Sequence, residues 1–123
     1  MPKTVAVVGA SSDRRKFGNK ALRAFAQQGY IVFPINPHER EIEGHPAFAS
    51  VLDVPGPIDM ATVYVRPEVG VRVMDDLAAK QVGEIWLNPG ADGPEVVARA
   101  GELGLKTIQA CSIIAIGETP RRF

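Results

Sequence analysis

The sequence predicts an α/β protein in which a doubly wound parallel sheet of five strands carries helices on both faces. Short apolar runs of strand length alternate with segments of helical periodicity, and three times the order along the chain is helix, glycine, strand. Helices of about ten residues or more are long enough to form the crossovers that join parallel strands. The simplest strand order is 3-2-1-4-5, within a single domain over residues 1–123.

The first half of the chain is expected to hold two strands and one helix. Residues 5–8 are an apolar run that stops at Gly9, which is typical of a buried strand followed by a turn. Residues 19–28 are expected to be helical because their apolar side chains share one face, and Gly29 suits the end of that helix. Residues 30–35 are rich in β-branched and aromatic side chains and predict the second strand.

The connection over residues 36–58 is expected to be irregular, because its four prolines argue against a long helix. We expect only a short extended piece near Ile42 and a turn of helix near residues 48–52. The third strand is predicted at residues 60–65.

The last part of the chain repeats the same order twice. Pro67 suits the first turn of a helix that carries Val69, Val73 and Leu77 on one line, and Gly83 ends that helix before a strand at residues 84–87. A third helix is expected to begin at residues 92–94 and to close at Gly104, before a fifth strand at residues 105–108.

Composition indicates a cytoplasmic protein without affinity for nucleic acid or membranes. Apolar residues make up 46% of the chain and charged residues 23%, so disorder is not expected. The 14 Lys and Arg balance the 14 Asp and Glu, which leaves no general attraction to polyanions. Cys111 is the lone cysteine and fits a reducing compartment, no apolar run approaches the roughly 20 residues of a membrane span, and the early strand argues against a signal peptide.

Ligands of doubly wound sheets bind beyond the carboxyl ends of the strands, where the winding reverses. For the predicted order this reversal lies between the first and fourth strands. Segments rich in Gly, Pro, Asn, Ser or charge follow all five strands: residues 9–16, 36–40, 66–67, 88–90 and 110–112. We therefore expect a binding site along this edge of the sheet.

The turn after the first strand has the chemistry of a phosphate cradle. Gly9 allows the backbone to approach a ligand closely, and Ser11 and Ser12 supply hydroxyl groups. The following helix directs unpaired N–H groups toward the same place. The basic residues of this turn, which are expected to add positive charge, are Arg14, Arg15 and Lys16.

Three other nucleotide- or phosphate-handling classes fit less well. The glycine turn lacks Gly-x-Gly-x-x-Gly, and the second strand ends at Asn36-Pro37 with no acidic residue for a ribose hydroxyl. Arg40 suits a 2′-phosphate, so these observations argue less strongly against NADP as the ligand than against NAD. A receiver domain would need an acidic pair for magnesium after the first strand, and the Walker motif of P-loop NTPases is absent.

Five motifs in order resemble a known family: Val-Gly-Ala-Ser-Ser, Val-Phe-Pro-Ile-Asn-Pro, Val-Tyr-Val-Arg-Pro, Ile-Trp-Leu-Asn-Pro-Gly and the late Cys111. Together they resemble the small stand-alone CoA-binding proteins, which are similar to the CoA-binding domain of the succinyl-CoA synthetase alpha subunit. The resemblance covers nearly the whole chain and implies a Rossmann-like fold with coenzyme A as ligand. It implies that the phosphates meet Gly9, Ala10, Ser11 and Ser12, that the adenosine lies near Asn36 and Pro37, and that Arg66, Pro67, Asn88, Pro89 and Gly90 flank the remaining groove.

Coenzyme A carries a diphosphate and a ribose 3′-phosphate, so it needs cations at two places. The basic residues of the glycine turn suit one, and His38 or Arg40 suits the other. Cys111 is read either as a small core residue or as a residue facing the CoA thiol. Family members often carry Glu four residues after this cysteine, where this chain has Ala115, which argues against a Cys–Glu catalytic pair.

No catalytic set is recognisable in the sequence, and His38 and His45 have no third partner for a metal ion. We therefore expect a module that binds CoA or acyl-CoA without catalysis of its own, with a homo-oligomer or a protein partner possible. Two alternatives stay open: a regulatory or partner-binding domain with weak nucleotide affinity, and a small NADP-dependent enzyme.

Overall fold

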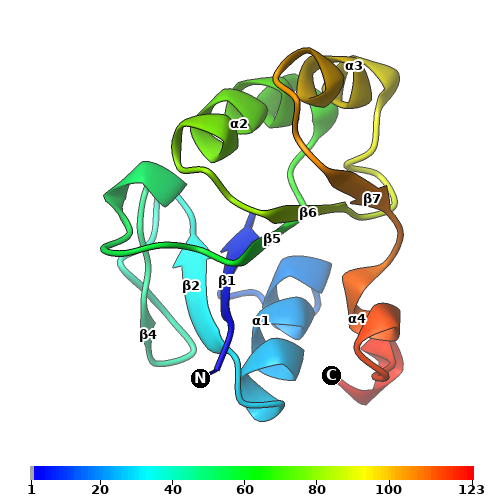
Figure 1. Ribbon diagram of the computed structural model, residues 1–123. Coiled ribbons are helices and arrows are strands. Elements are labelled where there is room, and N and C mark those ends of the chain that lie inside the picture. Colours follow the sequence, from blue (N-terminus) through cyan, green and yellow to red (C-terminus); the bar gives the residue numbers. More distant parts are fainter. Residues whose placement is uncertain (1) are drawn as a thin grey trace.

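The computed structural model describes residues 2–123, in which helices cover both faces of one parallel sheet (Figure 1). The elements in chain order are β1 (Thr4–Val8), α1 (Phe17–Gln27), β2 (Ile31–Ile35), β3 (Glu41–Ile42), β4 (His45–Pro46), the 3₁₀ turn η1 (Val51–Asp53), β5 (Met60–Val63), α2 (Pro67–Ala79), β6 (Glu84–Leu87), α3 (Pro94–Glu102), β7 (Thr107–Gln109), α4 (Ser112–Ala115) and η2 (Pro120–Arg122). All five predicted strands and all three predicted helices are confirmed. The sequence did not predict α4 and η2.

The five parallel strands lie in the order β2-β1-β5-β6-β7, which confirms the predicted doubly wound, Rossmann-like sheet. The place assigned to residues 60–65 is corrected, because β5 pairs with β1 rather than with β2. Beside β2, Phe48 forms a parallel bridge to Ile35, and this bridge takes the third place of the 3-2-1-4-5 pattern. All four residues of β5 are buried, and a strand buried on both faces belongs at the centre of a sheet.

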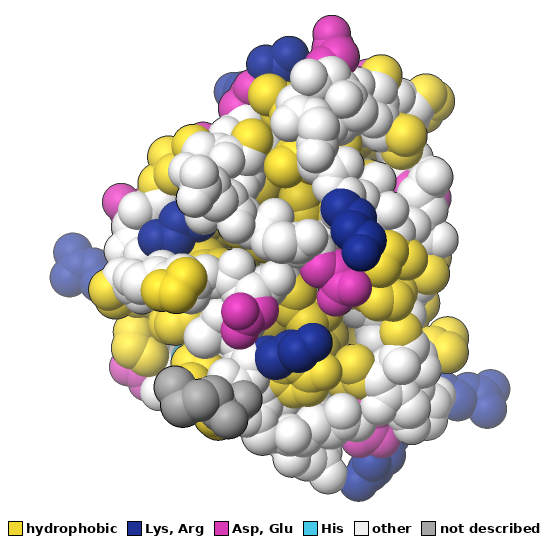
Figure 2. Space-filling model, in the orientation of Figure 1, with side chains coloured by type: hydrophobic (Ala, Val, Ile, Leu, Met, Phe, Trp, Pro, Cys, Tyr) yellow, Lys and Arg dark blue, Asp and Glu magenta, His cyan; other side chains and the backbone are white. Residues whose placement is uncertain are grey.

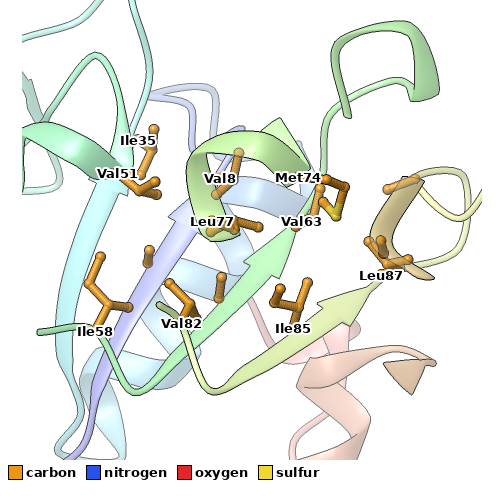
Figure 3. Close-up of a cluster of buried hydrophobic side chains, with 14 of the residues drawn as sticks. Val8, Ile35, Val51, Ile58, Val63, Met74, Leu77, Val82, Ile85 and Leu87 are labelled. Carbon is orange, nitrogen blue, oxygen red and sulfur yellow. The ribbon is translucent and has the colours of Figure 1, made fainter. Parts of the chain in front are cut away.

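Two hydrophobic cores lie on opposite faces of the sheet. Alternate residues of β1 supply them: Ala6 and Val8 face α2 and α3, whereas Val5 and Val7 face α1 and α4. Figure 3 shows the first core, where Met74 and Leu77 of α2 lie over the sheet. No helix within residues 2–123 is both long enough and apolar enough to cross a membrane.

The winding reverses between β1 and β5, so the chain leaves these neighbouring strands toward opposite faces. At this junction Gly9 has φ +90°, and its N–H donates to the Ile35 carbonyl at 3.1 Å. A Cβ atom on Gly9 would lie 3.0 Å from the Tyr64 carbonyl carbon. A Cβ on Gly18, in the first turn of α1, would lie 3.0 Å from the Gly9 carbonyl carbon and closer still to its oxygen. Two glycines therefore hold the turn against both β5 and α1.

The close approach predicts that Gly18→Ala destabilises the fold, because the added methyl group meets backbone rather than a movable side chain. We expect a loss of about 1–3 kcal/mol in the free energy of unfolding, measured by urea denaturation. Gly101→Ala in α3 is the matched control: a Cβ there has no neighbour within 4 Å, so the better helix propensity of alanine should stabilise the protein. Equal stability of the two variants would contradict the close approach.

Candidate functional site

A cleft of about 920 Å³ opens at the carboxyl edge of the sheet, around the ends of β1 and β5. Its volume lies in the range of small-molecule and cofactor sites. The glycine turn, the start of α1, the loop after β2, the first half of α2 and the turn after β6 all contribute to its walls. The cleft thus lies where the winding reverses, as the rule for doubly wound sheets requires.

The structure brings most of the predicted site residues together in the lining of this cleft. They are Gly9, Ala10, Ser11, Lys16, Asn36, Pro37, His38, Arg66, Pro89 and Gly90. They come from four segments that are far apart in the sequence and meet only because the parallel strands end at one edge.

In the part of the lining formed by the glycine turn and the first turn of α1, three backbone N–H groups have no hydrogen-bond acceptor among residues 2–123. They belong to Ser11 in the glycine turn and to Phe17 and Gly18 in the first turn of α1. Lys16, at the N-cap of the same helix, adds a positive charge to this end of the cleft. Unpaired N–H groups at a helix start together with a cation form an anion-binding site.

Arg14 and Arg15 do not line the cleft, so the predicted cluster of three cations is reduced there to Lys16. Arg14 binds Glu43 with two nitrogens, at 3.2 and 3.1 Å, and Arg15 binds Asp13 at 3.0 Å. These hydrogen bonds hold the pKa of the Glu43 carboxyl below its usual value and lower the pKa of Asp13 to about 2. The charge of Arg14 is therefore paired with a carboxylate of the β3–β4 turn, and the charge of Arg15 with a carboxylate of its own turn.

Ser12 also lies outside the lining, and its N–H donates to the Glu39 carboxylate at 3.0 Å. This contact lowers the pKa of Glu39, which places a negative charge next to the glycine turn. Arg40 is exposed on the same loop and does not line the cleft either. The loop is held to the glycine turn by Asn36, whose Nδ2 donates to the Ala10 carbonyl at 2.8 Å.

Asn88 and Pro67 do not flank the cleft as predicted, and Cys111 fits the first of its two predicted roles, that of a small residue at the core. Asn88 is buried and binds Thr62 and Ser112 behind the cleft, so it joins β5, β6 and α4. Cys111 is half-buried before α4 and packs against the core on that face. Pro67 occupies the first turn of α2, where it needs no hydrogen-bond partner for its nitrogen. None of the three belongs to the lining.

One wall of the cleft was missed by sequence reasoning. It is formed by one face of α2 and the residues that precede it: Tyr64, Val65, Val69, Arg72, Val73 and Asp76. The three- and four-residue spacing of Val69, Val73 and Asp76 was a visible signal for a shared helix face. The core is instead contacted most deeply by Gly70, Met74 and Leu77, which are the buried residues of α2.

The charge of the lining is predominantly positive. Lys16, Arg66 and Arg72 contribute cations, and within the described chain none of them forms an ion pair. Among residues 2–123, Asp76 supplies the only carboxylate of the lining. It accepts a hydrogen bond from the Ser50 hydroxyl at 3.4 Å. On the face seen in Figure 2, by contrast, basic and acidic side chains are interspersed.

Several relatives of known sequence are CoA ligases much longer than this chain. An ADP-forming acetate–CoA ligase of Archaeoglobus fulgidus is 33% identical over 90 residues, which are 72% of this chain and 13% of the ligase. The alpha subunit of an ADP-forming acetate–CoA ligase of Pyrococcus furiosus is 38% identical over 82 residues, 66% of this chain and 18% of that subunit. The chain thus spans less than a fifth of either relative.

Solved structures of similar fold include small and large proteins. A Thermus thermophilus protein shares 32% identity at a TM-score of 0.83, over 92% of this chain and 87% of that one. A dinucleotide-forming acetyl-coenzyme A synthetase of Candidatus Korarchaeum cryptofilum shares 31% identity at a TM-score of 0.76, over 89% of this chain and 26% of that one. The sequence pattern of the CoA binding domain matches residues 3–117, nearly the whole chain. The chain therefore belongs to the CoA-binding domain family.

Proposed function

We propose that this protein binds coenzyme A or an acyl-CoA in the cleft at the carboxyl edge of the sheet, without catalysis of its own. The observation that carries the proposal is the group of unpaired N–H donors of Ser11, Phe17 and Gly18 beside Lys16. A diphosphate is the anion that such a turn suits, because several donors and a cation converge on one place.

The rest of the lining fits the remainder of this ligand. Coenzyme A carries a second anionic group, the ribose 3′-phosphate, and the cleft offers two further unpaired cations in Arg66 and Arg72. His38 lies on the loop after β2, where the adenosine is proposed to lie. The apolar side chains of Val65, Val69 and Val73 give the cleft surface for the weakly polar pantetheine arm.

Binding without turnover is proposed because the polar side chains of the cleft are not arranged as a nucleophile and its base. The Ser11 hydroxyl accepts the N–H of Asp13 at 3.0 Å, and the Asp76 carboxylate is bonded to Ser50. Among residues 2–123 the His38 side chain makes no hydrogen bond to either of them. A reaction would require groups from another chain or domain.

A protein-binding role is the second candidate. It is favoured by the lengths of the relatives, since the matched segment is 13% and 18% of two CoA ligases, one of which is an alpha subunit. A domain of this kind would dock on further domains or on a second chain. This role predicts capture of a partner protein together with flat nucleotide titrations.

Calorimetric titration with coenzyme A, dephospho-CoA and NADP tests the proposed function. We expect coenzyme A to bind most tightly and dephospho-CoA about tenfold or more weakly, because a hydrogen-bonded ion pair to the 3′-phosphate is worth about 1.5–3 kcal/mol. Equal affinity for coenzyme A and dephospho-CoA would remove the second cationic site from the proposal. Tightest binding of NADP, with nicotinamide-linked turnover, would contradict the proposed CoA-binding function and indicate an oxidoreductase.

Lys16→Ala is expected to weaken coenzyme A binding about tenfold, because it removes the cation nearest the unpaired N–H groups. Arg15→Ala is the matched control from the same turn: Arg15 is 91% exposed and bonded to Asp13, so we expect little change. Calorimetry at two salt concentrations measures both affinities, and only the wild-type and control proteins should show the full salt dependence. An equal loss in both variants would contradict the placement of the diphosphate.

A further inference from the structure

A buried chain of hydrogen bonds leads from β6 to one wall of the cleft. Asn88 Nδ2 lies 2.6 Å from Thr62 Oγ1, which lies 2.8 Å from Ser112 Oγ. Ser112 Oγ lies 3.1 Å from the hydroxyl of Tyr64, a half-buried residue of the cleft lining. The proposed function makes no use of these hydrogen bonds.

Backbone groups fix the direction of its first hydrogen bond. Asn88 Oδ1 must face the N–H of Ser112, 2.9 Å away, and Nδ2 must face the carbonyl of Val63, 3.0 Å away. The amide nitrogen therefore donates to Thr62 Oγ1, because an amide NH₂ group does not accept. The hydrogen of the Thr62 hydroxyl is left with Ser112 Oγ as its acceptor.

Three hydroxyl groups then share two hydrogen bonds, so one hydroxyl hydrogen is left over. Thr62 is 0% exposed and Ser112 is 1% exposed, and an unpaired donor at either place would be costly. The arrangement that pairs both buried hydrogens runs from Thr62 to Ser112 and from Ser112 to Tyr64. The spare hydrogen therefore belongs to Tyr64, the one residue of the three that lines the cleft.

The Tyr64 hydroxyl keeps this hydrogen at neutral pH and can donate it to a ligand. Burial raises the pKa of Tyr64 above its usual value of 10.0, so the hydroxyl stays protonated at neutral pH. Along the edge of the sheet the segments follow in the order of their strands, from Asn36 after β2 through Gly9 after β1 to Tyr64 after β5 and Pro89 after β6. A ligand with its adenosine near Asn36 and its diphosphate at Gly9 extends its arm past Tyr64.

We propose that the Tyr64 hydroxyl donates a hydrogen bond to a carbonyl oxygen of the bound ligand, on the pantetheine arm or on the acyl group at its end. This inference rests on the proposed function and adds to it a residue that positions the arm. A carbonyl accepts such a hydrogen and offers none in return, which suits a hydroxyl whose oxygen already accepts from Ser112.

Tyr64→Phe tests the inference, with Tyr30→Phe as the matched control. The chain has two tyrosines, and Tyr30 packs edge-on against Phe25 outside the cleft. Titrations use coenzyme A, acetyl-CoA and adenosine 3′,5′-bisphosphate, which lacks the arm. We expect Tyr64→Phe to weaken the binding of an arm-bearing ligand about fivefold, to leave bisphosphate binding unchanged, and Tyr30→Phe to change none of the three. Loss with both CoA ligands would identify a pantetheine carbonyl, and loss with acetyl-CoA alone the thioester carbonyl.

A spectroscopic readout separates this role from a structural one. In the Tyr30→Phe protein the tyrosine Raman doublet reports on Tyr64 alone, and we expect it to show that the Tyr64 hydroxyl accepts a hydrogen bond both in the free protein and with coenzyme A bound. A free protein in which Tyr64 is only a donor overturns the inference whether or not coenzyme A binds. Wild-type-like affinities in Tyr64→Phe, or an equal loss with the bisphosphate, overturn it while the proposed function stands. A wild-type protein that binds none of the three ligands overturns both.

Discussion

The close approach of two glycines at the junction of β1, β5 and α1 is the constraint on which the site depends. Gly18 has no room for a side chain against the Gly9 carbonyl, and Gly9 has φ +90° and little room against Tyr64. Because no Cβ separates these segments, the first turn of α1 lies directly beside the glycine turn. That proximity places the unpaired N–H groups of Ser11, Phe17 and Gly18 in one end of the cleft.

Charge around this junction is divided between structural and free groups. Arg14 and Arg15 carry their charge into ion pairs with Glu43 and Asp13, which fasten the loop and the β3–β4 turn around it. Lys16, Arg66 and Arg72 keep theirs toward the cleft. Since exposed ion pairs contribute little to stability, the paired arginines matter chiefly for the shape of the loop, and the three free cations are the ones available to the proposed anionic ligand.

The fold was predictable from the sequence because its signals are local. Apolar runs, proline at helix starts and glycine at helix ends each depend on a few neighbouring residues, and all were recognisable. The place of β5 was not, because it depends on burial against β1 and β6, which are more than 20 residues away in the chain. Strand order is a property of long-range packing and not of any single segment.

The site was predictable where it follows the ends of strands and unpredictable where distant residues meet. The turns after β1, β2 and β6 were expected at the edge, and they line the cleft. Arg14 was expected there too, but its partner Glu43 lies 29 residues further along. Asn88 reads as part of a surface turn, yet its contact with Ser112 buries it. For Val69 and Val73, helical spacing indicated a shared face without indicating what that face contacts.

A crystal structure of this protein soaked with coenzyme A tests the central claim most directly. The account predicts the diphosphate against the glycine turn, within hydrogen-bond distance of the N–H groups of Ser11, Phe17 and Gly18, with Lys16 beside it. Coenzyme A bound elsewhere on the molecule, or bound in the cleft with its diphosphate away from this turn, would contradict it.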